Sequence, residues 1–183
     1  PPPPQAAATA PAPLAPSAPA PAPARSQAAA PPPLASAEPP PQRQRPLPGG
    51  QVLPVGTPQQ QYDFARALLV QQDYAAAERA FAAFVNTHPD DPLAGAAQYW
   101  LGETFYLRAN YDAAARAFAE GYQKFPKGSK APDSLLKLGM SLVQLNRKKD
   151  ACLLFKELEQ RYPAAPTNVK QAMQRERQRA SCS

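Results

Sequence analysis

The chain has 183 residues, of which 26 are proline, and carries a formal net charge of +6 at pH 7. No run of 18 or more apolar residues occurs, which argues against membrane insertion, and two cysteines are too few for a disulfide-rich scaffold or a four-cysteine zinc site. The charge is uneven, with +2 in residues 1–60, −3 in residues 61–124 and +7 in residues 125–183. This asymmetry indicates a solvated basic face or a steered protein contact, whereas nucleic acid is disfavoured because no aromatic platform accompanies the basic residues.

Residues 1–58 hold 20 of the prolines and contain no phenylalanine, tyrosine or tryptophan. Such a segment cannot bury enough apolar surface to offset the entropy of ordering it, so we expect a disordered, extended arm rich in Pro and Ala. The stretch 13–16 has Pro-x-x-Pro spacing, but any proline-rich run produces that spacing, and a spacer role is favoured.

Residues 59–183 contain an internal repeat with a period of 37, in three copies at about 59–91, 95–128 and 132–165. Three of its columns are Phe81, Phe118 and Phe155; Pro89, Pro126 and Pro163; and Ala65, Gly102 and Gly139. Apolar residues recur within each copy at intervals of three to four, which predicts two antiparallel helices joined by a tight turn. The small residues should let the two backbones approach closely, and the proline should end the second helix.

A last helix is expected over residues 167–180, capped by Thr167 or Asn168. Its inward-facing residues are Val169, Ala172 and Met173. The end of a solenoid needs such a helix with a polar outer face, which is favoured over a basic helix that contacts membrane or nucleic acid.

We expect Cys152 and Cys182 to form a disulfide. Cys152 lies near the start of the second helix of the third copy, and the capping helix should run back antiparallel to that helix. The end of the chain can then fold over to bring the two Cα atoms within the range of about 4.4–6.8 Å that a bridge requires. The alternative is one buried cysteine and one free thiol, whereas a bridge would indicate an oxidising compartment.

Catalysis has little support, and we expect no catalytic residue, metal or cofactor. The only histidine, His88, stands beside Pro89 at a helix end, and no nucleotide-binding, phosphate-binding or zinc-binding spacing occurs. A binding module is favoured. If the first helices line the inner face of the solenoid, the candidate partner-binding residues are Tyr62, Arg66, Tyr99, Glu103, Tyr106 and Met140. The alternative for each is packing between repeats; for the three tyrosines the groove is favoured, because a hydroxyl needs a partner or water.

The columns resemble the tetratricopeptide repeat, with Leu101 and Gly102 followed by Phe105 in the first helix. The resemblance implies an all-α solenoid of three helix pairs plus a capping helix. The usual repeat has 34 residues, and each copy here has three more. The first copy departs further, with Gln61 at the typical Trp position and Ala65 where Gly is usual.

Three stretches are more specific, namely residues 97–106, 125–139 and 151–163. Together they resemble the C-terminal domain of the CpoB/YbgF family of Tol-Pal-associated periplasmic proteins, over about residues 60–180. The resemblance implies a periplasmic location after removal of a signal peptide, and a homotrimer through an N-terminal coiled coil outside this sequence. It also implies TolA-like and bifunctional peptidoglycan synthase partners, and coordination of peptidoglycan synthesis with outer-membrane constriction during cell division.

Two other classes stay open. A scaffold of outer-membrane protein assembly usually has more repeats and a lipidated N-terminal cysteine. A cytosolic adaptor or co-chaperone would need reduced thiols and a Lys/Asn carboxylate clamp. The columns that match this clamp hold Tyr62, Arg66, Trp100, Asp133 and Lys137, so most of it is lacking.

Overall fold

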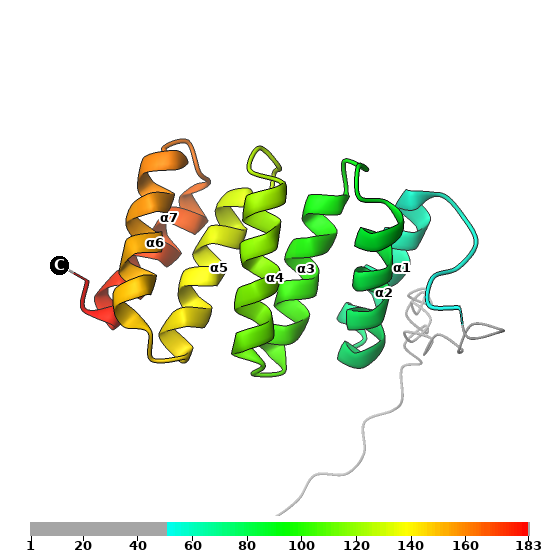
Figure 1. Ribbon diagram of the computed structural model, residues 1–183, viewed down its shortest axis with the longest axis horizontal. Coiled ribbons are helices and arrows are strands. Elements are labelled where there is room, and N and C mark those ends of the chain that lie inside the picture. The colour runs from blue at the N-terminus through cyan, green and yellow to red at the C-terminus, as the bar shows by residue number, and fades with distance from the viewer. Residues whose placement is uncertain (1–50, 183) are drawn as a thin grey trace, which may run out of the picture. The chain divides into compact units, whose positions relative to one another are not determined.

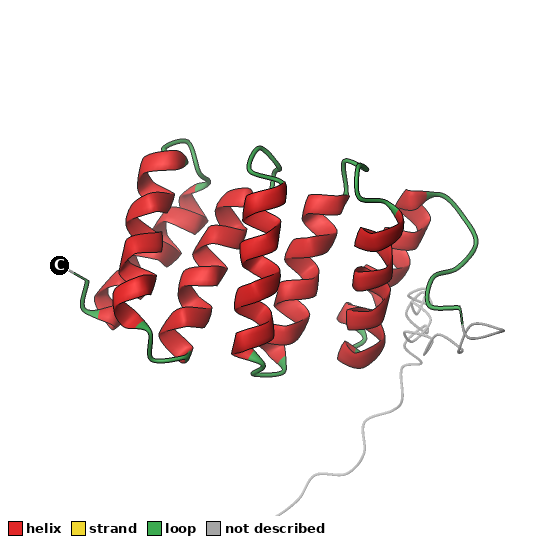
Figure 2. Cartoon of the chain, viewed as in Figure 1, coloured by secondary structure: helices red, strands yellow, loops and turns green. Residues whose placement is uncertain are grey.

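The computed structural model describes residues 51–182 as an array of seven α-helices without a strand (Figures 1 and 2). The helices are α1 (Pro58–Val70), α2 (Tyr74–Thr87), α3 (Ala94–Leu107), α4 (Tyr111–Lys124), α5 (Ala131–Gln144), α6 (Lys148–Arg161) and α7 (Thr167–Ala180). The predicted solenoid of three helix pairs and a C-terminal helix is confirmed. The expected disordered arm spans residues 1–58. Residues 1–50 of it lie outside the described residues, whereas residues 51–57 are described and lead into α1, which begins at Pro58. Within the described part of the chain, none of the helices has the length and apolar character that a membrane span requires.

The helices form two layers, with α2, α4 and α6 in front and α1, α3, α5 and α7 behind in Figure 1. Each helix packs against the next one in the chain, and α3 also packs against α1 and α5, while α5 packs against α7. Within this array, the backbones of α2, α4 and α6 do not approach one another, although side chains join α4 to α6. The first helices therefore form a continuous face, and the second helices stand apart with gaps between them.

Each pair is held by a phenylalanine of the second helix that packs on a small residue of the first. Phe81, Phe118 and Phe155 are completely buried. A Cβ added to Gly102 would lie 2.6 Å from Phe118 Cδ1, and one added to Gly139 would lie 2.4 Å from Phe155 Cε1. This is the close approach that the repeat predicts.

Local signals set the helix ends. Asp73 and Asn110 cap α2 and α4 by accepting hydrogen bonds from backbone N–H groups three residues on. Each second helix ends two residues before the proline of its copy, because the residue before proline disfavours the α conformation.

The predicted side-chain cap of the last helix is wrong. Neither Thr167 nor Asn168 caps it, since α7 already includes both residues. The Pro166 carbonyl instead accepts hydrogen bonds from the Val169 and Lys170 N–H groups at 3.0 and 3.1 Å.

At the N-terminal end, residues just before α1 join the folded unit. Leu53 packs against the core of the first helix pair, and the Pro54 carbonyl accepts a hydrogen bond of 2.9 Å from the Gln61 side chain. Gln61 Oε1 lies 2.7 Å from His88 Nε2, which gives this histidine the structural role expected of it.

At the C-terminal end, α7 packs on α5 and α6 through the buried Val169 and Met173. The predicted disulfide is present, with the Cα atoms of Cys152 and Cys182 5.5 Å apart. The bond ties the first part of α6 to the second residue after the end of α7.

Candidate functional site

The layer formed by α1, α3, α5 and α7, called here the first-helix face, carries all six predicted partner-binding residues. They lie in three groups, each at a contact between successive first helices. The groups are Tyr62 with Arg66, Glu103 with Tyr106, and Tyr99 with Met140.

Tyr62 and Arg66 of α1 meet at Trp100 of α3. The Trp100 indole N–H donates a hydrogen bond of 2.9 Å to the Tyr62 hydroxyl, and the Arg66 guanidinium lies 3.6 Å from the centre of the indole ring. Burial raises the pKa of the Tyr62 phenol, and the hydrogen bond from Trp100 partly opposes this effect. A cation over an indole contributes about 0.5–1 kcal/mol when exposed and more when desolvated.

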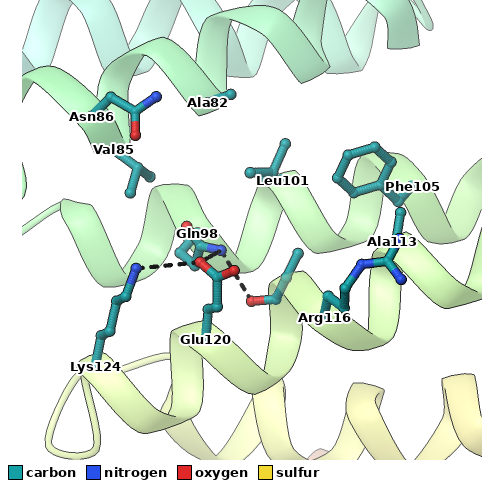
Figure 3. A pocket seen from close by; sticks show the side chains of 11 residues that line it. Ala82, Val85, Asn86, Gln98, Leu101, Phe105, Ala113, Arg116, Glu120 and Lys124 are labelled. Carbon is teal, nitrogen blue, oxygen red and sulfur yellow. Dashed lines mark hydrogen bonds and ion pairs between the residues drawn. The ribbon is translucent and has the colours of Figure 1, made fainter.

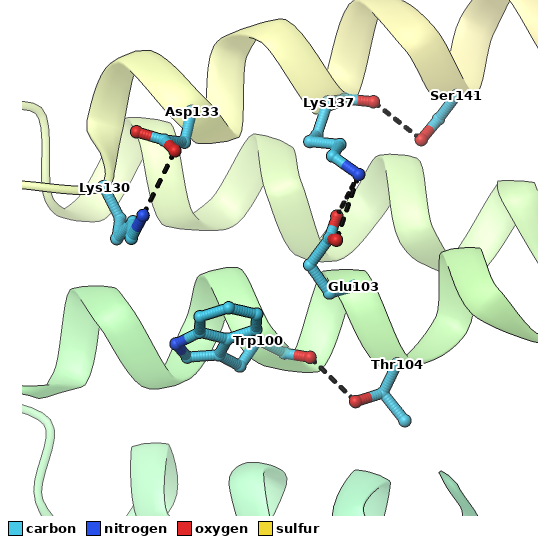
Figure 4. A network of polar contacts seen from close by, with 7 residues as sticks. All are labelled: Trp100, Glu103, Thr104, Lys130, Asp133, Lys137 and Ser141. Carbon is cyan, nitrogen blue, oxygen red and sulfur yellow. Dashed lines mark hydrogen bonds and ion pairs between the residues drawn. The ribbon is translucent and has the colours of Figure 1, made fainter. Parts of the chain in front are cut away.

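Glu103 and Tyr106 of α3 meet at Lys137 of α5, and Figure 4 shows the pair of Glu103 and Lys137. Lys137 Nζ lies 2.7 and 3.0 Å from the two Glu103 carboxylate oxygens and 4.7 Å from the centre of the Tyr106 ring. The two charged side chains, Glu103 and Lys137, are only 12% and 21% exposed. Because the pair is largely desolvated, removal of one partner would leave a costly uncompensated charge.

Tyr99 is more deeply placed than the groove interpretation required. It is 6% exposed, and its ring packs against Trp100 and Phe118, with centroids 5.0 and 5.7 Å away. Burial raises the pKa of its phenol far above the usual value, with a further contribution from the nearby Glu103 carboxylate. Tyr99 and Met140 nevertheless line one pocket of about 220 Å³ between α3, α5 and α7.

Sequence reasoning did not assign a role to Trp100 and Lys137, on which these contacts depend. Both occupy one column of the repeat, and each contacts the residue 34 positions earlier, Arg66 and Glu103 respectively. The same place between repeats thus holds a cation–π contact at the first junction and an ion pair at the second. The period of 37 in the sequence relates the two junctions to each other, but only the structure shows which columns meet across them.

A second feature that the sequence did not reveal is a groove of about 300 Å³ between α2 and α4 (Figure 3). Leu101 and Phe105 of α3 lie at its floor, and its walls and rim are Ala82, Val85, Asn86, Gln98, Ala113, Arg116, Ala117, Glu120 and Lys124. At the rim, Lys124 Nζ lies 3.3 Å from Glu120 Oε2. Gln98 donates to the Ala117 carbonyl at 3.1 Å, which joins α3 to α4 beside the groove.

The corresponding gap between α4 and α6 is occupied by Tyr122. Its hydroxyl donates a hydrogen bond of 2.6 Å to Glu157, and the Arg161 guanidinium lies 5.5 Å from the ring centre. Burial, and then the bond to the Glu157 carboxylate, raise the pKa of Tyr122 to about 12. The phenol therefore stays protonated in the folded state at pH values where an unfolded tyrosine ionises.

This shift predicts a loss of stability in alkali. The pKa of Tyr122 is raised from 10.0 to about 12 in the folded state. The contribution of this shift to the free energy of unfolding is therefore complete below pH 10, and it is lost as the pH rises from 10 towards 12. Tyr122→Phe should weaken this dependence and lower the free energy of unfolding at pH 7 by about 1–2 kcal/mol, since the hydrogen bond to Glu157 is removed.

Urea unfolding at a series of pH values measures both effects. Tyr74→Phe is the matched control, because Tyr74 is a half-buried tyrosine at the start of α2, outside this gap. An unchanged pH dependence in Tyr122→Phe would contradict the assignment.

The described residues contain no group of three or more His, Cys, Asp or Glu side chains placed to hold a metal ion. The arrangement is instead one of aromatic rings, cations and two apolar recesses, which suits the docking of side chains.

Comparison with known proteins gives two matches to models described as tetratricopeptide repeat, over residues 62–129 and 133–165, which together cover more than half of the chain. The chain is also similar to two curated proteins named cell division coordinator CpoB, both from Pseudomonas putida, one of them of strain KT2440. Each is 50% identical over 42 residues, which make up 23% of this chain and 16% of the relative. The match therefore spans about a sixth of the length of these relatives.

Proposed function

We infer, since the chain belongs to the tetratricopeptide-repeat family, that residues 51–182 bind a segment of a protein partner on the first-helix face. The observation that carries this proposal is the pocket between α3, α5 and α7. Its apolar lining comes from Tyr99, Leu136, Met140, Val169 and Ala172. Such a recess suits one apolar anchor side chain of the partner.

The surroundings of this pocket indicate the chemistry of the partner. Lys137 and Asp133 lie among its lining residues, and Lys130 Nζ is 3.1 Å from Asp133 and 5.0 Å from the centre of the Tyr99 ring. Each of these cations is already paired with a carboxylate, Lys130 with Asp133 and Lys137 with Glu103, so the rim of the pocket is polar without an excess charge. The partner segment is therefore apolar at its anchor and polar next to it.

We further propose that the partner belongs to the bacterial cell-division machinery in the periplasm, as a TolA-like protein or a bifunctional peptidoglycan synthase. In this role the protein coordinates peptidoglycan synthesis with constriction of the outer membrane through the Tol-Pal system. Similarity to proteins named cell division coordinator CpoB supports the process, and the disulfide fits an oxidising compartment.

Truncation of the anchor pocket tests the proposal. Met140→Ala should weaken capture of the partner by the full chain about tenfold or more, because the side chain lines the pocket directly. The measurement is a pull-down from an envelope extract, followed by calorimetric titration of the captured protein. Tyr99→Ala is unsuitable, because that side chain belongs to the core.

Leu153→Ala is the matched control, since this apolar side chain is 67% exposed on α6, away from the first-helix face. It should leave capture unchanged. Equal capture by Met140→Ala and Leu153→Ala, both with unaltered thermal unfolding, would place the interface elsewhere.

A further inference from the structure

The gap between neighbouring second helices occurs twice, between α2 and α4 and between α4 and α6, and the 37-residue period relates the two gaps position by position. Val85, Glu120 and Lys124 of the first gap correspond to Tyr122, Glu157 and Arg161 of the second. The two gaps are therefore built on the same backbone plan and differ in what fills them.

The second gap shows how a tyrosine fits this plan. Tyr122 lies in it with 9% of its surface exposed, and its hydroxyl donates to Glu157 at 2.6 Å. The Arg161 guanidinium lies over the ring, 5.5 Å from its centre, and forms an ion pair of 3.1 Å with Glu157. The Glu157 carboxylate and the Arg161 guanidinium thus bind the hydroxyl and the ring of the tyrosine in this gap.

The first gap has the same elements without the tyrosine. Val85 is too short to cross it, and the space of about 300 Å³ stays open above Leu101 and Phe105 (Figure 3). Glu120 and Lys124 form the same carboxylate–cation pair at its rim, 3.3 Å apart and more than half exposed. A volume near 300 Å³ is at the lower end of the range for ligand pockets.

We propose that this groove binds a tyrosine side chain from an acidic segment of a partner protein. The ring lies on Leu101 and Phe105, the hydroxyl donates to Glu120, and Lys124 faces the ring. The acidic character follows from Arg116, an exposed residue of the rim that forms no ion pair with any described residue. In the filled gap, the position that corresponds to Arg116 is Leu153, so only the open groove has a cation there. The Arg116 guanidinium complements a carboxylate next to the tyrosine of the partner.

The chain itself does not supply the occupant. All seven tyrosines of the chain lie within the described residues, and each of them is buried or half-buried in the helical array. A second copy therefore presents no exposed tyrosine to the groove. A different protein must provide the side chain.

The test uses the full chain, labelled with ¹⁵N, and two dipeptide probes, acetyl-Tyr-Asp-amide and acetyl-Phe-Asp-amide. The tyrosine probe should shift the backbone amide signals of α2, α3 and α4 around the groove, with saturation in the millimolar range. It should bind about tenfold more tightly than the phenylalanine probe, because only its hydroxyl can donate to the carboxylate. Glu120→Ala should abolish this preference.

Val85→Tyr copies the filled gap and should block both probes while the protein unfolds at or above the wild-type temperature. Val70→Tyr is the matched control, since Val70 is an exposed residue at the end of α1 and the added ring leaves the groove open. Ala82→Phe blocks the groove from α2 and serves if Val85→Tyr does not fold. Met140→Ala should leave probe binding unchanged, which separates this site from the first-helix face.

Saturable shifts at the groove that both blocking variants remove, together with the preference for tyrosine, would support the proposal. Shifts elsewhere, equal affinity for the two probes, or binding that survives Val85→Tyr would overturn it.

Discussion

Truncation of Phe155 to alanine is expected to lower the free energy of unfolding by about 3–5 kcal/mol. The side chain is completely buried, and it packs directly on the backbone of Gly139 across the third helix pair. Its loss leaves a cavity that the rigid helix pair cannot close. Urea unfolding followed by circular dichroism measures the effect.

The complementary change, Gly139→Ala, should cost about 1–3 kcal/mol, because the new Cβ would lie 2.4 Å from Phe155 Cε1. In the double variant, the added methyl group enters the cavity left by Phe155. The double loss should therefore be smaller than the sum of the single losses. Leu153→Ala, on the exposed side of the same helix, should change stability by no more than about 0.5 kcal/mol. Additive losses would show that the two residues do not share one packing site.

Removal of the disulfide has the second large expected effect. Cys152→Ser combined with Cys182→Ser should lower the free energy of unfolding by about 3–4 kcal/mol, because the bond closes a loop with a sequence separation of 30 in the unfolded chain. The last helix should respond most, since among the described helices it packs only against α5 and α6. Calorimetry gives the total loss, and hydrogen exchange of the α7 amides shows where it falls.

Reduction of the wild-type protein should reproduce the double variant, and the reductant should have no effect on the variant itself. An unchanged transition midpoint after complete reduction, verified by thiol titration, would show that packing alone holds α7.

The fold was predictable because its determinants repeat. Each copy has a Gly or Ala, a Phe and a Pro at fixed intervals, which specify a closely packed helix pair and its end. The pattern is weak in one copy, but its recurrence in three copies makes it reliable. The disulfide was expected from the antiparallel register of the last two helices, which allowed the pairing without requiring it. The left-handed turn residues at 72, 109 and 146 were less visible, since of Gln72, Ala109 and Asn146 only the last is a residue type that favours positive φ.

The candidate site was predictable only in part, because periodicity shows which residues share a face but not which side chains meet across it. Arg66 and Glu103 occupy one column and were assigned together, yet one covers an indole and the other pairs with a lysine. Tyr99 was favoured as a groove residue; its ring is largely buried in the core and also lines the pocket between α3, α5 and α7. The open groove depends on Val85 being small relative to Tyr122, a difference with meaning only once the two gaps are seen in space.

The bond between Cys152 and Cys182 also decides how the array carries mechanical load. Tension applied between residues 51 and 182 enters at α1 and leaves through the C-terminal cysteine, so the covalent link transmits it directly to the start of α6. Most of α6 and all of α7 lie inside the closed loop and bear no pulling force. At about 3.3–3.6 Å per extended residue, roughly 100 Å of chain is withheld from stretching until the bond is reduced. An oxidised array therefore extends over a shorter distance than its contour length suggests.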